Sequence, residues 1–159
     1  MYLPLLDEHV YWQFASGKLA EKSVILTKEA FHDLYSLVDG VTWYIQAVLN
    51  RLYRQQDIVV DMEQCRLAIK KIIQSEEEGY KRQIHALTLV QSKLLSAIAS
   101  EGIVKEPLSG KFVHAHKMKS SSSVQRALDY LVKEEYVYQT ENGYIVYDRF
   151  LGMWLANRI

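Results

Sequence analysis

The segment from residue 120 to residue 147 constrains the fold of this chain more than any other. Residues 120–134 place apolar side chains at helical spacing along one face, behind a run of serines that are typical helix N-caps. Two short stretches rich in aromatic and β-branched residues, 136–139 and 144–147, then flank the dipeptide Asn142-Gly143. An Asn-Gly pair between such stretches is a strong signal of a β-hairpin. We therefore expect an amphipathic helix followed by a hairpin, and the inward face of the helix would consist of Val124, Ala127, Leu128, Leu131 and Val132.

The residues before this segment complete a recognisable order of elements. A helix is predicted over about residues 87–100, closed by Gly102. Residues 103–119 contain Pro107 and Ser109-Gly110, so we expect an irregular connection, partly extended around Phe112 and Val113. Helix, connection, helix and hairpin in this order predict a winged helix-turn-helix over residues 85–159. The predicted core face of its first helix is Leu87, Val90, Leu94 and Ile98, and a final helix would carry Phe150, Met153 and Trp154.

Helical periodicity dominates the first hundred residues, so the fold class is mainly α, and residues 1–80 should form a small helical bundle. In the first helix we expect Leu6, Val10 and Phe14 to face the core, with an end at Ser16-Gly17. Thr27 is the predicted N-cap of a second helix, which Asp39-Gly40 ends. The clearest apolar stripe belongs to a third helix and comprises Val41, Tyr44, Ile45, Val48, Leu49, Leu52 and Tyr53.

A fourth helix is predicted to start at Asp61, because Gln64 three residues later suggests a capping box. The domain boundary is expected where the pattern turns polar, around residues 76–82, inside a long or kinked helix. Cys65 is the only cysteine and falls on the apolar face, which predicts a buried, inert thiol and excludes a disulfide framework. A reducing compartment, the cytoplasm, follows as the expected location, and no apolar run is long enough to cross a membrane.

The sequence offers little catalytic chemistry. It contains neither a GxxxxGK[ST] phosphate loop nor a GxGxxG motif, so no nucleotide hydrolysis and no cofactor are expected in this chain. His114 and His116 are spaced to share one face of a strand, but two imidazoles without nearby thiolates or carboxylates make a poor metal site. We therefore expect a protein that binds and is not itself an enzyme.

A local excess of basic residues suggests what the winged helix binds. Lysine plus arginine equals aspartate plus glutamate over the whole chain, yet residues 105–133 hold six basic residues against Glu106 and Asp129. In a helix-turn-helix protein the outward face of the second helix enters the major groove, and nearby lysines reach phosphates. The candidate nucleic-acid-binding residues are Lys117, Lys119, Ser122, Ser123, Gln125 and Arg126.

Other features oppose DNA binding. Asp129 would repel the phosphate backbone, and the predicted wing tip, Thr140-Glu141-Asn142, is acidic or neutral. A winged helix used for packing or for contact with a protein partner is the alternative.

Two segments resemble a known protein family. Residues 35–53 (YSLVDGVTWYIQAVLNRLY) and residues 91–155 are similar to the C-terminal half of archaeal-type AAA+ ATPases of the STAND kind, which are common in archaea and in gut Bacteroidetes. In that family a P-loop core is followed by a small helical lid and then a winged helix. The ending from Tyr144 to Phe150, followed by Trp154, matches the family's Tyr-x-x-x-Asp-x-Phe closure of the wing.

The resemblance implies a division into a lid-like bundle, residues 1–80, and a winged helix, residues 85–159. It also implies that this chain is the non-catalytic part of an ATPase. A P-loop core N-terminal to Met1 would then be a partner and would bind ATP and Mg²⁺, and the chain would couple its nucleotide state to DNA or to a protein. The sequence departs from the family at one position. Related ATPases often carry an arginine beside the glycine that starts the third lid helix, and this arginine senses the γ-phosphate of the nucleotide. Here Val41 and Thr42 follow Gly40, and the next arginine is Arg51.

Two alternatives stay open: a free-standing winged-helix transcription regulator with a helical dimerisation or sensor domain, and a protein-interaction adaptor.

Overall fold

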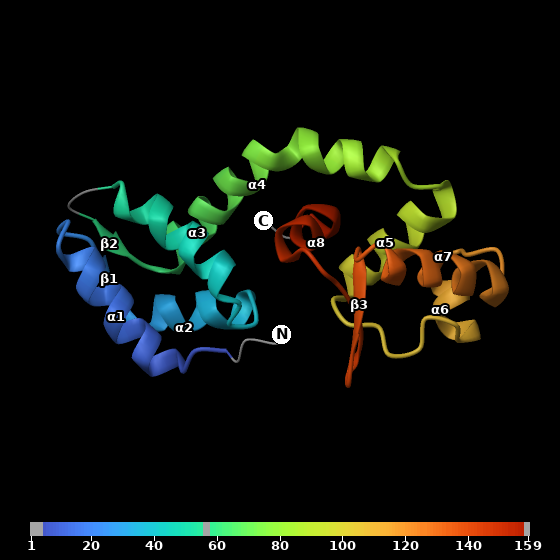
Figure 1. Ribbon diagram of the computed structural model, residues 1–159, viewed down its shortest axis with the longest axis horizontal. Helices are drawn as coiled ribbons and strands as arrows, with labels where there is room; N and C mark the ends of the chain where they lie inside the picture. The colour runs from blue at the N-terminus through green and yellow to red at the C-terminus, as the bar shows by residue number, and fades with distance from the viewer. Residues whose placement is uncertain (1–4, 56–57, 158–159) are drawn as a thin grey trace. The chain divides into compact units, whose positions relative to one another are not determined.

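The structure is a computed structural model that describes residues 5–55 and 58–157 (Figure 1). The chain divides into two compact units, Met1–Gln74 and Ser75–Ile159. Helix α4, Met62–His85, begins in the first unit and ends in the second. The fold is mainly helical, with a small two-stranded hairpin in the second unit, as the sequence predicted.

The first helix, α1 (Glu8–Ala20), is present, but the predicted buried face is wrong. Leu6, Val10 and Phe14 are 48%, 62% and 63% exposed, and the core side consists of Tyr11, Ala15 and Leu19. Apolar residues occur at a four-residue spacing on two opposite faces of this helix, so periodicity alone could not choose between them. The helix also continues through Ser16 and Gly17, because a glycine inside a helix costs only about 1 kcal/mol.

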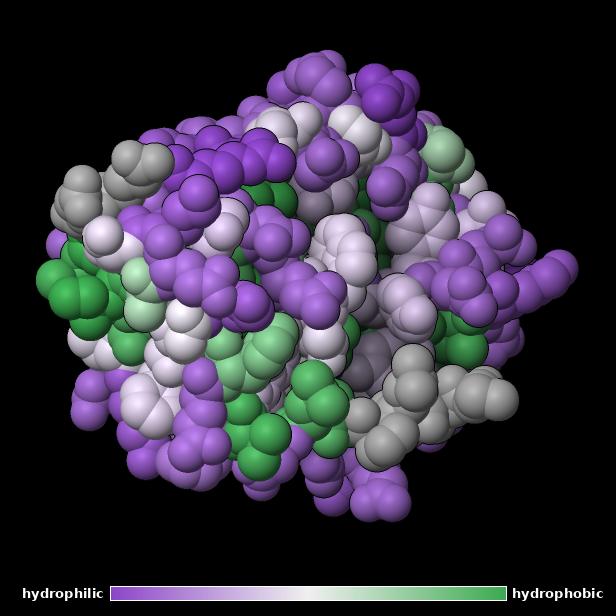
Figure 2. Space-filling model, turned by 60° about the vertical axis from the view of Figure 1, so that its left-hand side comes forward, coloured by the Kyte–Doolittle hydropathy of each residue, from purple (hydrophilic) through white to green (hydrophobic). Residues whose placement is uncertain are grey.

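Apolar side chains consequently remain on the surface in the first unit. Figure 2 shows apolar residues, in green, lying among hydrophilic ones on the face turned forward. The large exposed apolar residues of this unit include Leu5, Leu6, Val10, Phe14, Ile25, Trp43 and Val59.

Helices α2 (Lys28–Leu37) and α3 (Thr42–Tyr53) carry fully buried side chains of the first unit, among them Phe31, Leu34, Ile45 and Leu52. The Thr27 cap is confirmed, since its Oγ1 accepts the Ala30 amide at 3.1 Å. The turn between the helices needs Gly40, which has φ +68° and would place a Cβ 2.6 Å from the Tyr35 ring. The predicted α3 stripe is confirmed at its centre, where the buried residues are Tyr44, Ile45, Val48 and Leu52; Tyr53 is 36% exposed.

A two-residue parallel strand pair was not predicted. Strand β1 (Ile25–Leu26) pairs with β2 (Val59–Val60), Ile25 opposite Val59 and Leu26 opposite Val60. The pair joins the α1–α2 connection to the α3–α4 connection. Leu26 and Val60 are buried while their strand neighbours are exposed, an alternation too short to detect in sequence.

Helix α4 starts after Asp61, whose carboxylate accepts the Gln64 amide at 2.9 Å. It continues as one helix of 24 residues through the polar stretch, including Gly79. In this stretch Lys81 forms ion pairs with Glu77 at 3.3 Å and with Glu78 at 2.9 Å. The two glutamates precede it by four and three residues, so they lie on the same face of the helix.

The second unit is built around α5 (Leu89–Glu101), which lies against α7, α8 and strand β4. Thr88 begins this helix with a capping box completed by Gln91. The predicted start near Leu87 placed Val90 in the core, but Val90 lies in the first turn and is 36% exposed. The core face is provided by Leu94, Leu95 and Ile98.

The connection predicted to be irregular and partly extended contains a helix, α6 (Gly110–Ala115). Ser109 caps it by accepting the Phe112 amide at 3.2 Å, and Phe112 is buried. Ser109-Gly110 therefore begins a helix here and does not form a loop. Six residues are too few to show helical periodicity in the sequence.

The predicted hairpin consists of β3 (Val137–Thr140) and β4 (Gly143–Val146), with Val137 opposite Val146. The glycine acts differently from the prediction, because Gly143 is the first residue of β4 and has φ +135°. A Cβ at this position would lie 2.6 Å from the Val104 carbonyl oxygen, and Val104 itself bridges to Tyr144. The glycine thus allows a third backbone segment to approach the hairpin.

The last helix, α8 (Arg149–Ala156), is capped by Asp148, which accepts the amides of Phe150 at 2.9 Å and Leu151 at 3.1 Å. Phe150 is buried, and Trp154 packs on Tyr80 of α4 with ring centroids 5.7 Å apart. No helix among the described residues is long and apolar enough to span a membrane.

Candidate nucleic-acid interface

Helices α6 and α7 (Ser121–Lys133) form the helix-turn-helix of the second unit. The Lys117 amide donates to the His114 carbonyl at 3.0 Å and the Met118 amide to the Val113 carbonyl at 2.8 Å, which ends α6. Lys117 has φ 50°, a left-handed conformation that a residue with a Cβ rarely adopts. This residue lies in the turn between the two helices.

Helix α7 begins at the serine run, as predicted. Ser120 is extended, with φ −167°, and its Oγ accepts the Ser123 amide at 3.2 Å. Ser121 donates from its Oγ to the Leu108 carbonyl at 2.9 Å, which ties the helix start to the α5–α6 connection. The face that packs inward consists of Val124, Ala127, Leu128 and Leu131, while Val132 is 38% exposed.

Five of the six predicted site residues are exposed at one end of the helix-turn-helix. Lys117 and Lys119 lie in the turn, and Ser122, Gln125 and Arg126 lie on the first two turns of α7. Neither lysine nor Arg126 makes an ion pair within the described part of the chain. The turn and the start of α7 therefore present positive charge that the protein does not neutralise.

The sixth residue, Ser123, differs from the others. It is half-buried, and its Oγ donates to the Ser120 carbonyl at 2.8 Å. The Ser122 hydroxyl, by contrast, is exposed, 3.1 Å from the Ser120 hydroxyl. Ser123 thus belongs to the helix cap, and Ser122 is the serine available to a ligand.

Gln125 and Asp129 are linked along the exposed face of α7. The Gln125 side-chain nitrogen donates to an Asp129 carboxylate oxygen at 2.6 Å. This bond uses one donor of the amide and leaves its oxygen and a second N–H available. Asp129 lies about one helical turn after Arg126, and its carboxylate is hydrogen-bonded to Gln125.

Two lysines of the second unit, Lys111 and Lys93, were not among the predicted site residues. Lys111 is exposed on α6, where it adds a further positive charge. Lys93 projects from α5, and its Nζ donates to the Lys117 carbonyl at 2.7 Å. The excess of basic residues between 105 and 133 could have indicated Lys111, but no sequence signal connects Lys93 with a turn 24 residues away.

The histidines of α6 do not share a strand face. His116 caps the end of α6, where its Nε2 pairs with Glu101, and its ring lies 4.4 Å from that of Phe112. His114 is exposed. Within residues 5–55 and 58–157 no three His, Cys, Asp or Glu side chains gather as metal ligands.

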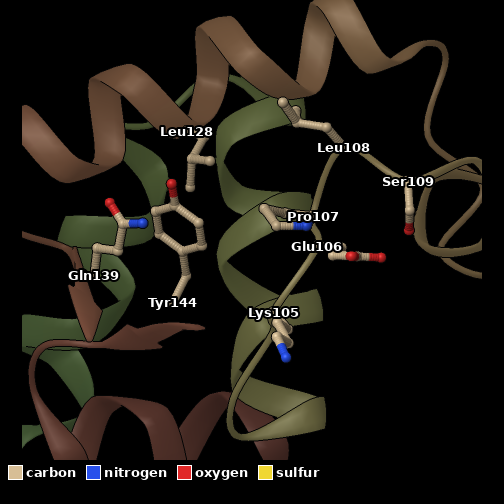
Figure 3. A pocket seen from close by; sticks show the side chains of 8 residues that line it. All are labelled: Lys105, Glu106, Pro107, Leu108, Ser109, Leu128, Gln139 and Tyr144. Atoms are coloured by element: carbon tan, nitrogen blue, oxygen red, sulfur yellow. The ribbon is translucent and has the colours of Figure 1, made fainter. Parts of the chain in front are cut away.

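A hollow of about 280 Å³ lies beside α7, between the hairpin and the α5–α6 connection (Figure 3). Gln139 and Tyr144, which are cross-strand partners, line one side, and Leu128 of α7 is in its wall. Lys105 and Glu106 carry opposite charges at the same hollow. It therefore has no net charge that would attract a phosphate, in contrast to the turn.

No curated protein and no solved structure matches this chain. Residues 78–157 match the model of a family described as a probable winged helix domain. The match begins within α4 and covers α5, the helix-turn-helix, the hairpin and α8, half of the chain. The chain belongs to this winged helix family.

Proposed function

We propose that the winged helix binds duplex DNA through a basic surface made of Lys111, Lys117, Lys119 and Arg126. The observation that carries this proposal is that all four side chains are exposed and that none forms an ion pair with a described residue. Unneutralised lysines and arginines gain affinity by displacing counterions from phosphates.

The roles of the residues follow from their positions. Lys117 and Lys119 precede α7, where a helix lying in the major groove is flanked by the DNA backbone, so they would contact phosphates. Arg126, Ser122 and Gln125 lie on the exposed side of the first two turns and would approach base edges. Arginine suits a guanine edge because its planar donors match two acceptors.

Two acidic residues, Asp129 and Glu141, limit the part of the surface that can bind DNA. The Asp129 carboxylate accepts a hydrogen bond from Gln125, and the exposed Glu141 lies at the wing tip. The wing would therefore supply little attraction, and most of the affinity should come from the basic surface.

We further propose that the chain is the non-catalytic, coupling part of an AAA+ ATPase. Support comes from the resemblance of residues 35–53, which fall on α2, the Gly40 turn and α3, and of residues 91–155, which run from α5 to α8. In this proposal the first unit is the lid, and a P-loop core outside this chain binds ATP and Mg²⁺. The chain would act in the cytoplasm, transmitting nucleotide state to DNA or to a protein partner. A P-loop motif encoded in frame upstream of Met1 would support this reading, whereas its absence from the gene would favour a free-standing winged-helix regulator.

DNA binding can be tested by fluorescence anisotropy with a labelled random duplex at low ionic strength, repeated over a series of salt concentrations. The variant Lys117→Ala, Lys119→Ala, Arg126→Ala should lose affinity and keep its fold, because none of the three side chains is in the core. Each phosphate contact removed should lower the slope of log affinity against log salt by roughly one.

The matched control removes three exposed charges from α4, at Arg66, Lys70 and Lys71, and should bind like the wild type. A folded wild-type protein that shows no salt-dependent binding would refute the DNA proposal. It would favour the alternative in which the winged helix contacts a protein.

A further inference from the structure

Two side chains of α5 reach the turn between α6 and α7. Lys93 donates from its Nζ to the Lys117 carbonyl at 2.7 Å, and Glu101 pairs with Nε2 of His116. Lys93, Ala97 and Glu101 are spaced by four residues, so they share one face of α5. Ala97 between them is only 5% exposed. One face of α5 therefore contacts two consecutive residues, His116 and Lys117, at the start of the turn.

The bond from Lys93 is made at a residue with a strained backbone conformation. Lys117 is left-handed, with φ 50°, although it has a Cβ. Its carbonyl lies beyond His116, the C-cap of α6, and outside the hydrogen bonds of that helix. The Lys93 ammonium donates to this carbonyl across 24 residues of sequence.

This bond also distinguishes Lys93 from the lysines of α6 and of the α6–α7 turn. The side chains of Lys111, Lys117 and Lys119 are exposed and make no ion pair within the described residues. Lys93 is exposed as well, yet its ammonium is directed at the protein's own backbone.

We infer that Lys93 is a positioning residue that holds the α6–α7 turn in the conformation that presents Lys117 and Lys119 to a phosphate backbone. It acts through the Lys117 carbonyl and does not itself contact phosphate. The inference rests on the proposed DNA binding, but the conformation of the turn can be tested without DNA.

The first test is amide hydrogen exchange, measured by NMR on the full chain. Lys93→Met should speed exchange at the amides of Lys117 and Met118 by about fivefold, because the turn loses a charge-assisted hydrogen bond to its backbone. Lys93→Arg, which keeps a cationic donor, should restore slow exchange, and Lys71→Met on α4 should change nothing. Unchanged exchange in Lys93→Met would overturn the inference.

The second test is the salt dependence of DNA affinity. Lys93→Met should weaken binding about three- to tenfold while the slope against log salt stays at the wild-type value, since no phosphate contact is lost. Lys117→Met should lower the slope by about one. A slope that falls by one in Lys93→Met would make Lys93 an ordinary phosphate contact and overturn its positioning role. If the wild type does not bind DNA, the DNA proposal fails, and hydrogen exchange alone decides whether Lys93 holds the turn.

Discussion

Replacing Gly143 by alanine tests why the hairpin needs a glycine at its first β4 residue. The backbone there has φ +135°, a region that is almost exclusive to glycine, and an added Cβ would lie 2.6 Å from the Val104 carbonyl oxygen. To relieve that contact, Val104 must move away from Tyr144. Two backbone hydrogen bonds link these residues, with lengths of 3.0 Å and 2.8 Å.

The expected cost follows from three contributions. Backbone strain at such a φ costs about 1–3 kcal/mol. Weakening the two hydrogen bonds costs about 1 kcal/mol each. Alanine also lowers the conformational entropy of the unfolded chain, which offsets about 0.4–1 kcal/mol of this loss. Gly143→Ala should therefore lower the free energy of unfolding of the second unit by roughly 2–5 kcal/mol.

Urea denaturation can measure this in a protein carrying Trp12→Phe and Trp43→Phe. Trp154, whose ring lies 5.7 Å from that of Tyr80, is then the only tryptophan and reports on the second unit. The control is Gly110→Ala, because a Cβ at Gly110 would meet nothing within 4 Å and should be neutral or slightly stabilising. A loss below about 0.5 kcal/mol for Gly143→Ala would refute the argument that Val104 excludes a side chain here.

Three further predictions concern the core, the thiol and nucleotide binding. Leu52 is fully buried, so Leu52→Ala should lower the free energy of unfolding by about 2–5 kcal/mol. Leu6 is half-exposed, so Leu6→Ala should lower it far less. Equal losses for the two variants in urea denaturation would show that the assigned core is wrong. Burial raises the pKa of the Cys65 thiol to about 12, so the native protein should resist thiol reagents at pH 8. Because the unfolded thiol ionises near pH ~8.5, stability should fall as the pH rises above that value, and a Cys65→Ala variant should lack this component in denaturation measured between pH 8 and pH 10. Finally, the isolated chain should neither bind nor hydrolyse ATP, since its sequence contains no P-loop lysine or glycine-rich cradle; micromolar affinity in calorimetry would contradict this.

The elements with strong, one-sided patterns could be predicted from the sequence. Helix α7 carries its buried side chains on a single stripe, and the central four residues of α3 do the same. The caps at Thr27, Asp61 and Ser120 are local bonds between residues three apart, so a short stretch of sequence contains all the information they need.

Local patterns could not decide features that depend on distant parts of the chain. The apolar residues of α1 form two faces, and only its packing against α2 and α3 selects Tyr11, Ala15 and Leu19 for the core. Strands β1 and β2 pair residues more than 30 positions apart, and each strand has only two residues. Helix α6 has only six residues, and the burial of Phe112 in the second unit accompanies its formation.

The candidate interface divides in the same way. The sequence by itself determined which cationic residues are concentrated near the start of α7, because charge and helical phase are properties of a contiguous segment. Only the tertiary structure showed that Ser123 is half-buried and bonded within the cap, that Glu101 pairs with His116, and that Lys93 bonds the Lys117 carbonyl. These contacts depend on how α5 packs beside the helix-turn-helix, and such packing follows from the burial of the whole core, which no short stretch of residues encodes.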